Sequence, residues 1–378
     1  MSPTSQDGPR VPRMSDVAKR AGVSHQTVSR VINGMPGVRP ETRDRVLQAV
    51  EDLHYRRNLA ARLLASRRSR TVGVVTWGTE QFGPANVLLA LEAAARESEY
   101  RLATVNVEAM SREAFRAAVT DLQERVVEAM VVIVPHETIL REAHSLDLDI
   151  PTVVVEGDMS RTPLTAGFDN FEGGRLATRH LLSLGHETVI HLSGPNGWAE
   201  AHARRDGWRA ELESQGRRIP PLRWGGDWSA ASGYRTGKSL ARERDVTAVF
   251  VGNDQMALGL LRALREAGRR VPEDVSVIGF DDLPEAGYFQ PPLTTMRQDF
   301  PKLGQRVMEV LSRVLDGEKE PTVDLVPTTL VVRESTARSP TARRWAPTGR
   351  CRSRPTISRS SRSPSRKPSR TPASIPPT

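Results

Sequence analysis

Short runs rich in valine and isoleucine recur between residues 71 and 337, and they constrain the fold more than any other feature. The first set reads TVGVVTW, YRLATVNV, AMVVIVP and PTVVVEG, and the second reads ETVIHLSG, TAVFVGND, DVSVIGFDD and LTTMRQDF. Amphipathic segments lie between the runs. Continuous apolar runs separated by helices are typical of parallel strands covered on both faces. The two successive sets therefore predict an α/β domain with two lobes.

Polar and aromatic side chains follow several of these predicted strands. In open α/β sheets, ligands bind beyond the carboxyl ends of the strands. The cleft between the two lobes is therefore the predicted ligand site. The residues that end the runs are Trp77, Glu156, Asn253, Asp254, Asp281 and Asp282.

A helical pattern precedes the strands. The segments SDVAKRAG, SHQTVSRVING and PETRDRVLQAVEDLHY predict three short helices, and AGVS is the glycine-containing turn of a helix-turn-helix. Ser15 and Ser24 are the predicted N-caps, Gly22 and Gly34 the stops, and Pro40 opens the third helix. The apolar spacing predicts one small core, made of Val17, Ala18, Ala21, Val28, Val31, Val46, Val50 and Leu53.

The second of these helices has an apolar side and a polar side. Val28, Val31 and Ile32 hold it against the small core. Its opposite side would fit a major groove, where Gln26 suits an adenine edge and Arg30 a guanine. Taken alone, such a helix would be a solvated surface, but the preceding helix, the turn and the basic surroundings favour DNA binding.

The net charge of +9 is distributed unevenly. Residues 14–70 hold twelve basic and five acidic side chains, whereas residues 71–337 carry a net charge of −10. Because phosphate repels an acidic body, only the basic head is expected to contact DNA. Residues 338–378 hold eleven basic and no acidic side chains, with few large apolar groups. We expect this Ser/Arg/Pro-rich tail to be disordered and assign it no role.

Several classes of protein are excluded. The single cysteine, Cys351, allows no internal disulfide, and we expect no metal and no cofactor. No apolar run is long enough for a membrane span or a signal peptide, so we expect a cytoplasmic protein with no membrane partner, associated with the nucleoid when it binds DNA. That prediction and the intact head also argue against a transport receptor.

One segment of the sequence is similar to a motif of nucleotide-hydrolysing enzymes. SGYRTGKS resembles a phosphate-binding loop, but Ser232 stands where that loop needs glycine. HExxH and GxSxG motifs are absent from the sequence, and the histidines at 186, 191 and 202 lack metal-ligand spacing. The sequence therefore predicts that the chain is not an enzyme.

The whole pattern resembles the LacI family of bacterial transcription regulators. The resemblance begins with MSDVAKRAGVSHQTVSRVING and VRPETRDRVLQAVEDLHYRRNLAARLLA. It continues with LLSLGH, GDWSAASGY, VGNDQMALGLLRAL, DVSVIGFDD and PPLTTMRQDF. The last four motifs resemble the lac branch more than the purine-responsive branch. The resemblance implies a disordered start (1–13), a helix-turn-helix domain (14–57), a hinge helix and linker (58–70), a periplasmic-binding-protein-like effector and dimerisation domain (71–337) and the disordered tail (338–378).

The resemblance also implies roles for residues of the head and hinge. His25 and Gln26 match the family's base-reading pair, and Arg30 matches the arginine that contacts guanine. The lac branch has tyrosine at the position of His25, so the operator should differ at the base pairs that this position reads. The hinge segment NLAARLLA is too short for a stable isolated helix in water and should fold only when paired on DNA. Within it, Leu64 matches the leucine that wedges between base pairs. The full predicted set is Ser24, His25, Gln26, Thr27, Ser29, Arg30, Asn33, Asn58, Ala61 and Leu64.

In the cleft, the resemblance implies a sugar site. Arg204, Asn253 and Asp281 match residues that bind sugar hydroxyls, and Trp228 matches an indole that stacks on the pyranose. Helix capping by Asn253 or Asp254 is an equally good interpretation. The remaining predicted effector residues are Trp77, Glu156, Gln298 and Phe300. Trp77, Gln81, Trp198 and Glu200 depart from the lac branch, which predicts a different or longer sugar: a galactoside, a glucoside or an oligosaccharide.

The predicted function is sequence-specific repression of sugar-utilisation genes. Because leucine heptads are absent after residue 335, we expect a homodimer on double-stranded, pseudo-palindromic operator DNA. A small-molecule sugar between the lobes would release the operator. The alternative within the same family is a regulator that depends on a corepressor or a protein partner.

Overall fold

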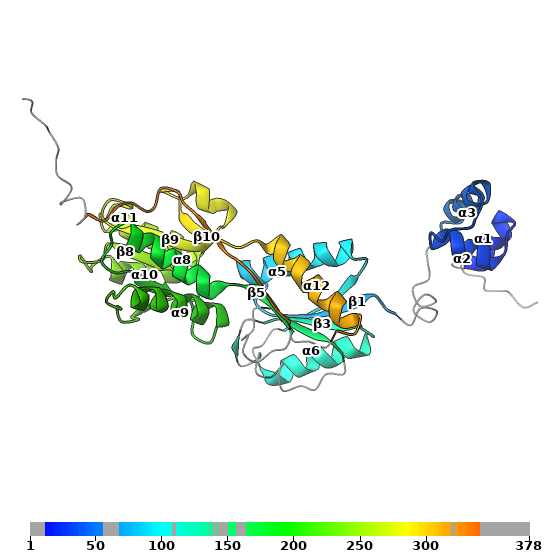
Figure 1. Cartoon of the computed structure of the whole chain (residues 1–378), viewed down its shortest axis with the longest axis horizontal. Helices are drawn as coiled ribbons and strands as arrows, with labels where there is room; N and C mark the ends of the chain where they lie inside the picture. Colours follow the sequence, from blue (N-terminus) through cyan, green and yellow to red (C-terminus); the bar gives the residue numbers. More distant parts are fainter. Residues whose placement is uncertain are drawn as a thin grey trace, which may run out of the picture.

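The computed structural model describes residues 12–55, 68–107, 111–134, 136, 137, 139, 142, 150–155, 164–318 and 322–340. The predicted N-terminal segment before residue 12, the hinge segment 58–65 and the tail from 341 on lie outside these residues. The head comprises three helices, drawn in blue in Figure 1: α1 (Met14–Ala21), α2 (His25–Ile32) and α3 (Pro40–Asp52). The predicted small core is confirmed, since Val17, Val28 and Val46 are completely buried among these helices.

The predicted ends of the head helices are confirmed with one exception. The Ser24 hydroxyl accepts the N–H of Thr27 at 3.1 Å, and Gly22 takes the left-handed conformation that ends α1. The prediction for Ser15 is wrong. Asp16 accepts the backbone N–H of Arg13 at 2.7 Å, so Arg13 is the cap and α1 begins before Ser15.

The first lobe is built on a six-stranded parallel sheet with the order β11-β5-β4-β3-β1-β2. Helices α5 (Phe82–Glu97) and α12 (Phe300–Leu315) pack on one face, and α6 (Arg112–Glu124) packs on the other. The strands are β1 (Thr71–Thr76), β2 (Arg101–Asn106), β3 (Ala129–Ile133), β4 (Thr152–Val155), β5 (Leu164–Phe168) and β11 (Thr322–Val326).

The second lobe repeats this plan with the order β12-β10-β9-β8-β6-β7, in which β12 alone runs antiparallel to its neighbour. Its helices are α8 (Asn170–Ser183) and α9 (Ala199–Ser214) on one face, and α10 (Ala230–Leu240) and α11 (Asp254–Glu266) on the other. The strands are β6 (Ile190–Ser193), β7 (Trp224–Gly225), β8 (Ala248–Val251), β9 (Ser276–Asp281), β10 (Thr294–Arg297) and β12 (Thr329–Val331), and a 3-10 turn, η1, covers Pro284–Tyr288.

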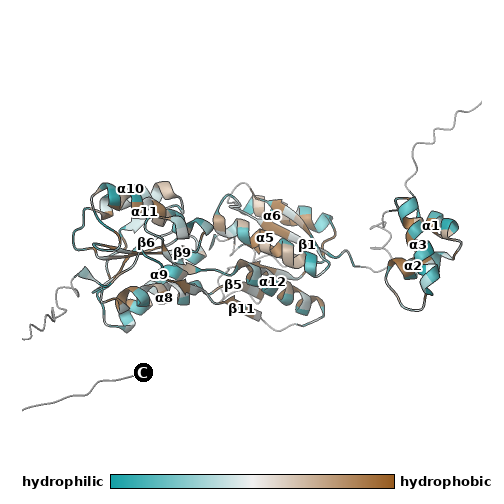
Figure 2. Ribbon diagram, turned by 90° about the horizontal axis from the view of Figure 1, so that it is seen from above, coloured by the Kyte–Doolittle hydropathy of each residue, from teal (hydrophilic) through white to brown (hydrophobic). Residues whose placement is uncertain are grey.

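The chain passes between the lobes three times: from β5 to α8, from β10 to α12 and from β11 to β12. The predicted two-lobed fold is confirmed, but the two sets of strands are not simply consecutive, because α12 and β11 return to the first lobe (Figure 1). Hydropathy colouring shows brown strands enclosed by helices with teal outer faces (Figure 2). The parallel strands are therefore covered on both sides, as their apolar runs predict.

Two negative findings apply to the described part of the chain. It contains no helix that is long and apolar enough to cross a membrane. The same residues contain no group of three or more His, Cys, Asp or Glu side chains that would hold a metal ion.

Candidate DNA-reading helix and ligand cavity

Helix α2 presents its polar side chains to solvent while Val28, Val31 and Ile32 are buried. Thr27 and Ser29 are half-buried and hydrogen-bond within the helix, to Ser24 at 2.9 Å and to Asn33 at 3.3 Å. The exposed side chains of this segment are Ser24, His25, Gln26, Arg30 and Asn33, of which Ser24 and Asn33 are the hydrogen-bond partners just named. The hinge residues Asn58, Ala61 and Leu64 lie outside the described residues.

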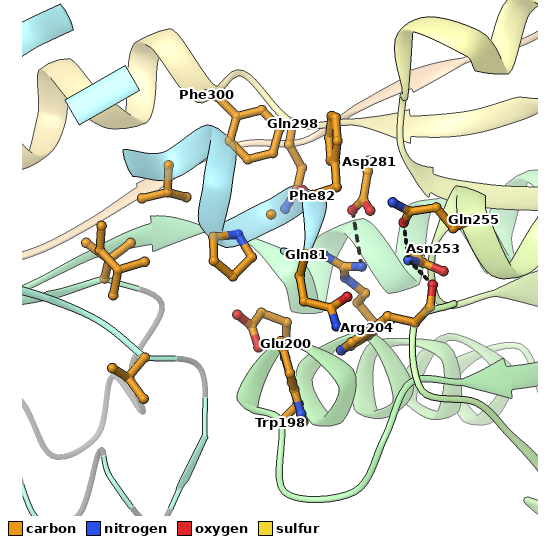
Figure 3. Close-up of a pocket in the computed structure, with 17 residues that line it drawn as sticks. Gln81, Phe82, Trp198, Glu200, Arg204, Asn253, Gln255, Asp281, Gln298 and Phe300 are labelled. Carbon is orange, nitrogen blue, oxygen red and sulfur yellow. Dashed lines mark hydrogen bonds and ion pairs between the residues drawn. The ribbon is translucent and has the colours of Figure 1, made fainter. Parts of the chain in front are cut away.

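A cavity that is partly open to solvent lies between the lobes (Figure 3). The residues around it follow β1, β6, β7 and β8, lie at the ends of β3, β4 and β9, or lie on the crossing from β10 to α12. The carboxyl ends of the parallel strands in both sheets therefore face one cavity, as predicted for open α/β sheets.

The two lobes supply different chemistry to the cavity. The second lobe contributes most of the hydrogen-bonding groups, namely Glu200, Arg204, Asn253, Gln255 and Asp281, and two indoles, Trp198 and Trp228. Apart from Gln81, the first lobe contributes mainly apolar contacts: Phe82, Gly83, Pro84, Val87, Ile133, Val134 and Val155. Gln298 and Phe300 complete the lining at the crossing from β10 to α12.

Arg204 is the best-anchored charged group of the cavity. Its Nε donates to Asn170 Oδ1 at 2.8 Å, and its Nη1 donates to the carbonyl of Gly252 at 2.6 Å and lies 3.3 Å from the Asp281 carboxylate. The guanidinium also lies over the ring of Phe280, 3.8 Å from its centroid. Because these partners come from three different elements, the orientation of the guanidinium is fixed before any ligand arrives.

Asp281 lies at the end of β9 with φ of 106°, a conformation that is costly for a residue with a side chain. Its neighbour in the cavity wall, Asn253, accepts the N–H of Met256 at 2.9 Å and so caps α11 while also lining the cavity. The capping interpretation of Asn253 is therefore confirmed, and its role in ligand binding stays a prediction. Asp254 is completely buried away from the lining, where it accepts hydrogen bonds from Thr295 Oγ1 at 2.6 Å and Leu283 N at 2.9 Å. Burial, and then the Asp281 charge, raises the pKa of Asp254 well above its usual value.

Three indoles form a row that begins in the first lobe and ends in the second. Trp77 lies 5.6 Å from Trp198, and Trp198 lies 5.6 Å from Trp228 at nearly right angles. The prediction that Trp77 lines the cavity is wrong. Trp77 instead packs against Trp198, which does line it. The buried indole N–H of Trp228 has no hydrogen-bond partner among the described residues.

Six of the predicted effector residues line the cavity: Arg204, Trp228, Asn253, Asp281, Gln298 and Phe300. Glu156 lies outside the described residues. The prediction omitted Phe82 and Gln255. Phe82 contacts Phe300 edge to face, with 5.6 Å between ring centroids, and the Oε1 of Gln255 accepts a hydrogen bond from Asn253 Nδ2 at 2.6 Å. A signal for Gln255 was present, because it follows the strand-ending Asn253 by two residues, whereas Phe82 begins a helix that has no such marker.

The SGYRTGKS segment and two of the histidines considered for an enzyme have structural roles in the second lobe. The segment SGYRTGKS lies within α10 and therefore forms a helix, not a phosphate-binding loop. The hydroxyl of Ser232 donates to the carbonyl of Ser229 at 2.8 Å. His191 is buried between the rings of Trp208 and Phe250, and His186 contacts Thr247 and Ser276. Burial lowers the pKa of both histidines to about 4.

A helix-turn-helix head followed by a two-lobed unit with a cavity between its lobes defines a ligand-binding, DNA-binding regulator. Two family comparisons agree with that class. Residues 13–58 match "Bacterial regulatory proteins, lacI family", and residues 178–336 match "Periplasmic binding protein-like domain".

Whole-chain comparisons identify the family. The lactose operon repressor of Escherichia coli K12 is 36% identical over 327 residues, which cover 85% of this chain and 89% of that protein. The HTH-type transcriptional repressor PurR of Escherichia fergusonii is 35% identical over 338 residues, covering 86% and 97%. The chain therefore belongs to the lacI family and is a DNA-binding repressor with a ligand-binding domain, not an enzyme.

Solved structures show the same fold. A lac repressor dimer bound to operator and the anti-inducer ONPF matches with a TM-score of 0.79 and 33% identity, covering 87% of this chain and all of that one. The complex of the transcriptional regulator CelR with cellobiose matches with a TM-score of 0.63 and 30% identity, covering 86% and 99%.

Proposed function

We propose that the chain represses sugar-utilisation genes as a homodimer and that a sugar in the cavity releases it from a pseudo-palindromic operator. The observation that carries this proposal is that the indole of Trp228 lines the same cavity as Arg204, Asn253 and Asp281. A pyranose has C–H groups that pack on an aromatic face and hydroxyls that need donors and acceptors around its edge. A buried hydroxyl without a partner costs about 1–3 kcal/mol, so this arrangement selects hydroxylated ligands.

The proposed mechanism couples lobe arrangement to DNA binding. In a dimer, two α2 helices would face successive half-sites, and the hinge segments would pair in the minor groove. The sugar shifts the equilibrium only by the difference between its affinities for the two lobe arrangements, and couplings of about 1–3 kcal/mol are typical. The homodimer is supported by the solved dimer of the lac repressor and by exposed apolar side chains, which include Leu89, Leu258 and Tyr288.

A second candidate is a corepressor-dependent regulator. It is favoured by the aromatic side chains on both sides of the cavity, Trp228 and Trp198 from one lobe and Phe82 and Phe300 opposite, which would also hold a planar ring. The two candidates differ in the sign of the response, because a corepressor strengthens operator binding and an inducer weakens it.

The deciding experiment starts with selection of an operator from random duplex DNA by the purified full chain. The selected duplex is then titrated with a panel of mono- and disaccharides and with purine bases, and binding is followed by fluorescence anisotropy. Loss of binding with one sugar supports induction and names its class. Stronger binding with a panel compound, or a selected palindrome that no compound affects, would move the assignment to a corepressor or a protein partner.

A further inference from the structure

Asn170 connects the cavity to the first crossing between the lobes. It is the first residue of α8, two residues after β5 ends, and only 5% of its surface is exposed. Its side-chain oxygen accepts the Nε–H of Arg204 at 2.8 Å, and its amide group donates to the Phe168 carbonyl at 3.4 Å. Asn170 does not itself line the cavity, so its contact with a ligand would be indirect, through Arg204.

The backbones of α8 and α9 are in close contact on either side of this hydrogen bond. A Cβ at Gly174 would overlap the backbone carbonyl of Arg204, and a Cβ at Gly207 would overlap the carbonyl of Phe171. Interiors packed this closely do not deform gradually. A displacement of the N-terminus of α8 is therefore transmitted to the residue that carries the guanidinium.

A second crossing lies close to the same turn of α8. A Cβ at Gly173 would overlap Thr328, on the crossing from β11 to β12, and the ring of Phe280. Phe280 is the ring over which the Arg204 guanidinium lies. The first turn of α8 thus contacts two of the three crossings and is bonded to the best-anchored charge of the cavity.

We propose that Asn170 is a positioning residue, which holds the Arg204 guanidinium in its ligand-facing orientation and links that orientation to the crossing between the lobes. This inference rests on the proposed function, in which Arg204 contacts the effector. Loss of the Asn170 acceptor would leave Nε–H of Arg204 without its partner, and the guanidinium would turn toward another acceptor.

The test compares Asn170→Ala with Asn170→Asp in the full chain, because aspartate retains an acceptor for Nε–H. Phe171→Ala is the matched control on the same helical turn, where the side chain is exposed. Crystal structures of the variants without ligand report the position of Arg204 relative to the Gly252 carbonyl. Operator release is then titrated with lactose and with cellobiose by fluorescence anisotropy.

In the alanine variant we expect Arg204 to leave the Gly252 carbonyl and the sugar concentration for half-release to rise about tenfold, as for loss of a hydrogen bond to a charged group. Operator affinity without sugar should stay within about twofold of the wild type, and the aspartate and Phe171 variants should respond like the wild type. A purely structural role would instead lower the melting temperature and operator affinity together.

The inference is overturned if Arg204 keeps its contact with Gly252 in the alanine variant, or if release is unchanged. If neither sugar releases the wild type, the proposed function fails in that form, whereas the position of Arg204 in the crystals still decides the role of Asn170. Should the alanine variant fail to fold, Asn170→Gln moves the acceptor by one methylene and serves the same comparison.

Discussion

The indole of Trp228 lies so close to the backbone of Gly194 that a Cβ at residue 194 would overlap its six-membered ring. Trp228 itself has a left-handed backbone, with φ of 71°. The ring that lines the cavity is therefore positioned by the absence of a side chain on the loop after β6.

Gly194→Ala should push Trp228 into the cavity. Overpacking of this kind typically costs 1–3 kcal/mol, so we expect effector affinity to fall by roughly tenfold or more. Gly225→Ala is the control, because a Cβ there would meet Ser193 only at ordinary contact distance, 3.5 Å. Calorimetric titration with the sugar identified by the operator assay checks the prediction, and equal affinities for both variants would contradict it.

Arg30→Ala should remove a base contact from the exposed face of α2. We expect affinity for the selected operator to fall by about 1–3 kcal/mol, with relaxed preference at one base pair per half-site. Arg45→Ala removes the same charge from the exposed side of α3 and should weaken all duplexes alike, by less. Operator binding is measured by anisotropy at one fixed salt concentration, against substituted duplexes. A uniform loss in the Arg30 variant would mean that Arg30 contacts only phosphate.

Leu64→Ala should weaken operator binding while sugar affinity stays the same. This prediction comes from the sequence, because Leu64 lies outside the described residues. Without the apolar wedge, the kink that exposes the minor groove loses its support. Anisotropy on operator DNA and calorimetry with sugar separate the two effects, and wild-type operator affinity in the variant would refute the hinge mechanism.

Leu258→Asp should prevent dimerisation. Leu258 is 44% exposed on α11, in a surface hollow that also includes Ala231, Tyr234 and Leu261. A carboxylate buried at an interface without a partner is strongly unfavourable. Sedimentation velocity should show a monomer, with loss of tight operator binding, whereas Leu222→Asp, 42% exposed elsewhere on the same lobe, should remain a dimer. A dimeric Leu258 variant would place the interface on another face.

His191→Phe should make stability less dependent on pH. Burial lowers the pKa of His191 to about 4 from its usual 6.5, and the same cause lowers the pKa of His186 to about 4. Between these pH values the unfolded chain binds protons that the folded chain excludes, so stability is complete above pH ~6.5 and falls as the pH drops toward 4. Each histidine accounts for about 3 kcal/mol over that window.

In the His191 variant, the slope of unfolding free energy against pH should therefore be smaller than in the wild type, by the contribution of one histidine. Urea unfolding at a series of pH values between 7 and 5 measures both slopes. Glu211 does not interfere, because hydrogen bonding to Arg179 lowers its pKa to about 2. Parallel slopes for the two proteins would show that His191 becomes protonated in the folded state.

Some features of this protein follow from local sequence. Helix α2 and its Ser24 cap, the small core around Val28 and the alternating strands and helices all depend on residues that are neighbours along the chain, so periodicity and turn chemistry predict them. Strand β5 escaped prediction because LTAGF is short and carries glycine and threonine, and its strand conformation depends on β4 and β11 on either side.

The ligand cavity depended on contacts that local sequence does not encode. The family resemblance predicted Arg204, Trp228, Asn253 and Asp281. It did not predict the contacts among Trp77, Trp198 and Trp228 or the hydrogen bond from Arg204 to Asn170, because these contacts join segments tens of residues apart. The sequence by itself determined the element types and the chemistry available to the site. Tertiary structure alone decided which side chains share the cavity, because three crossings and the glycine contacts of α8 and α9 set the distances between segments that have no local relation.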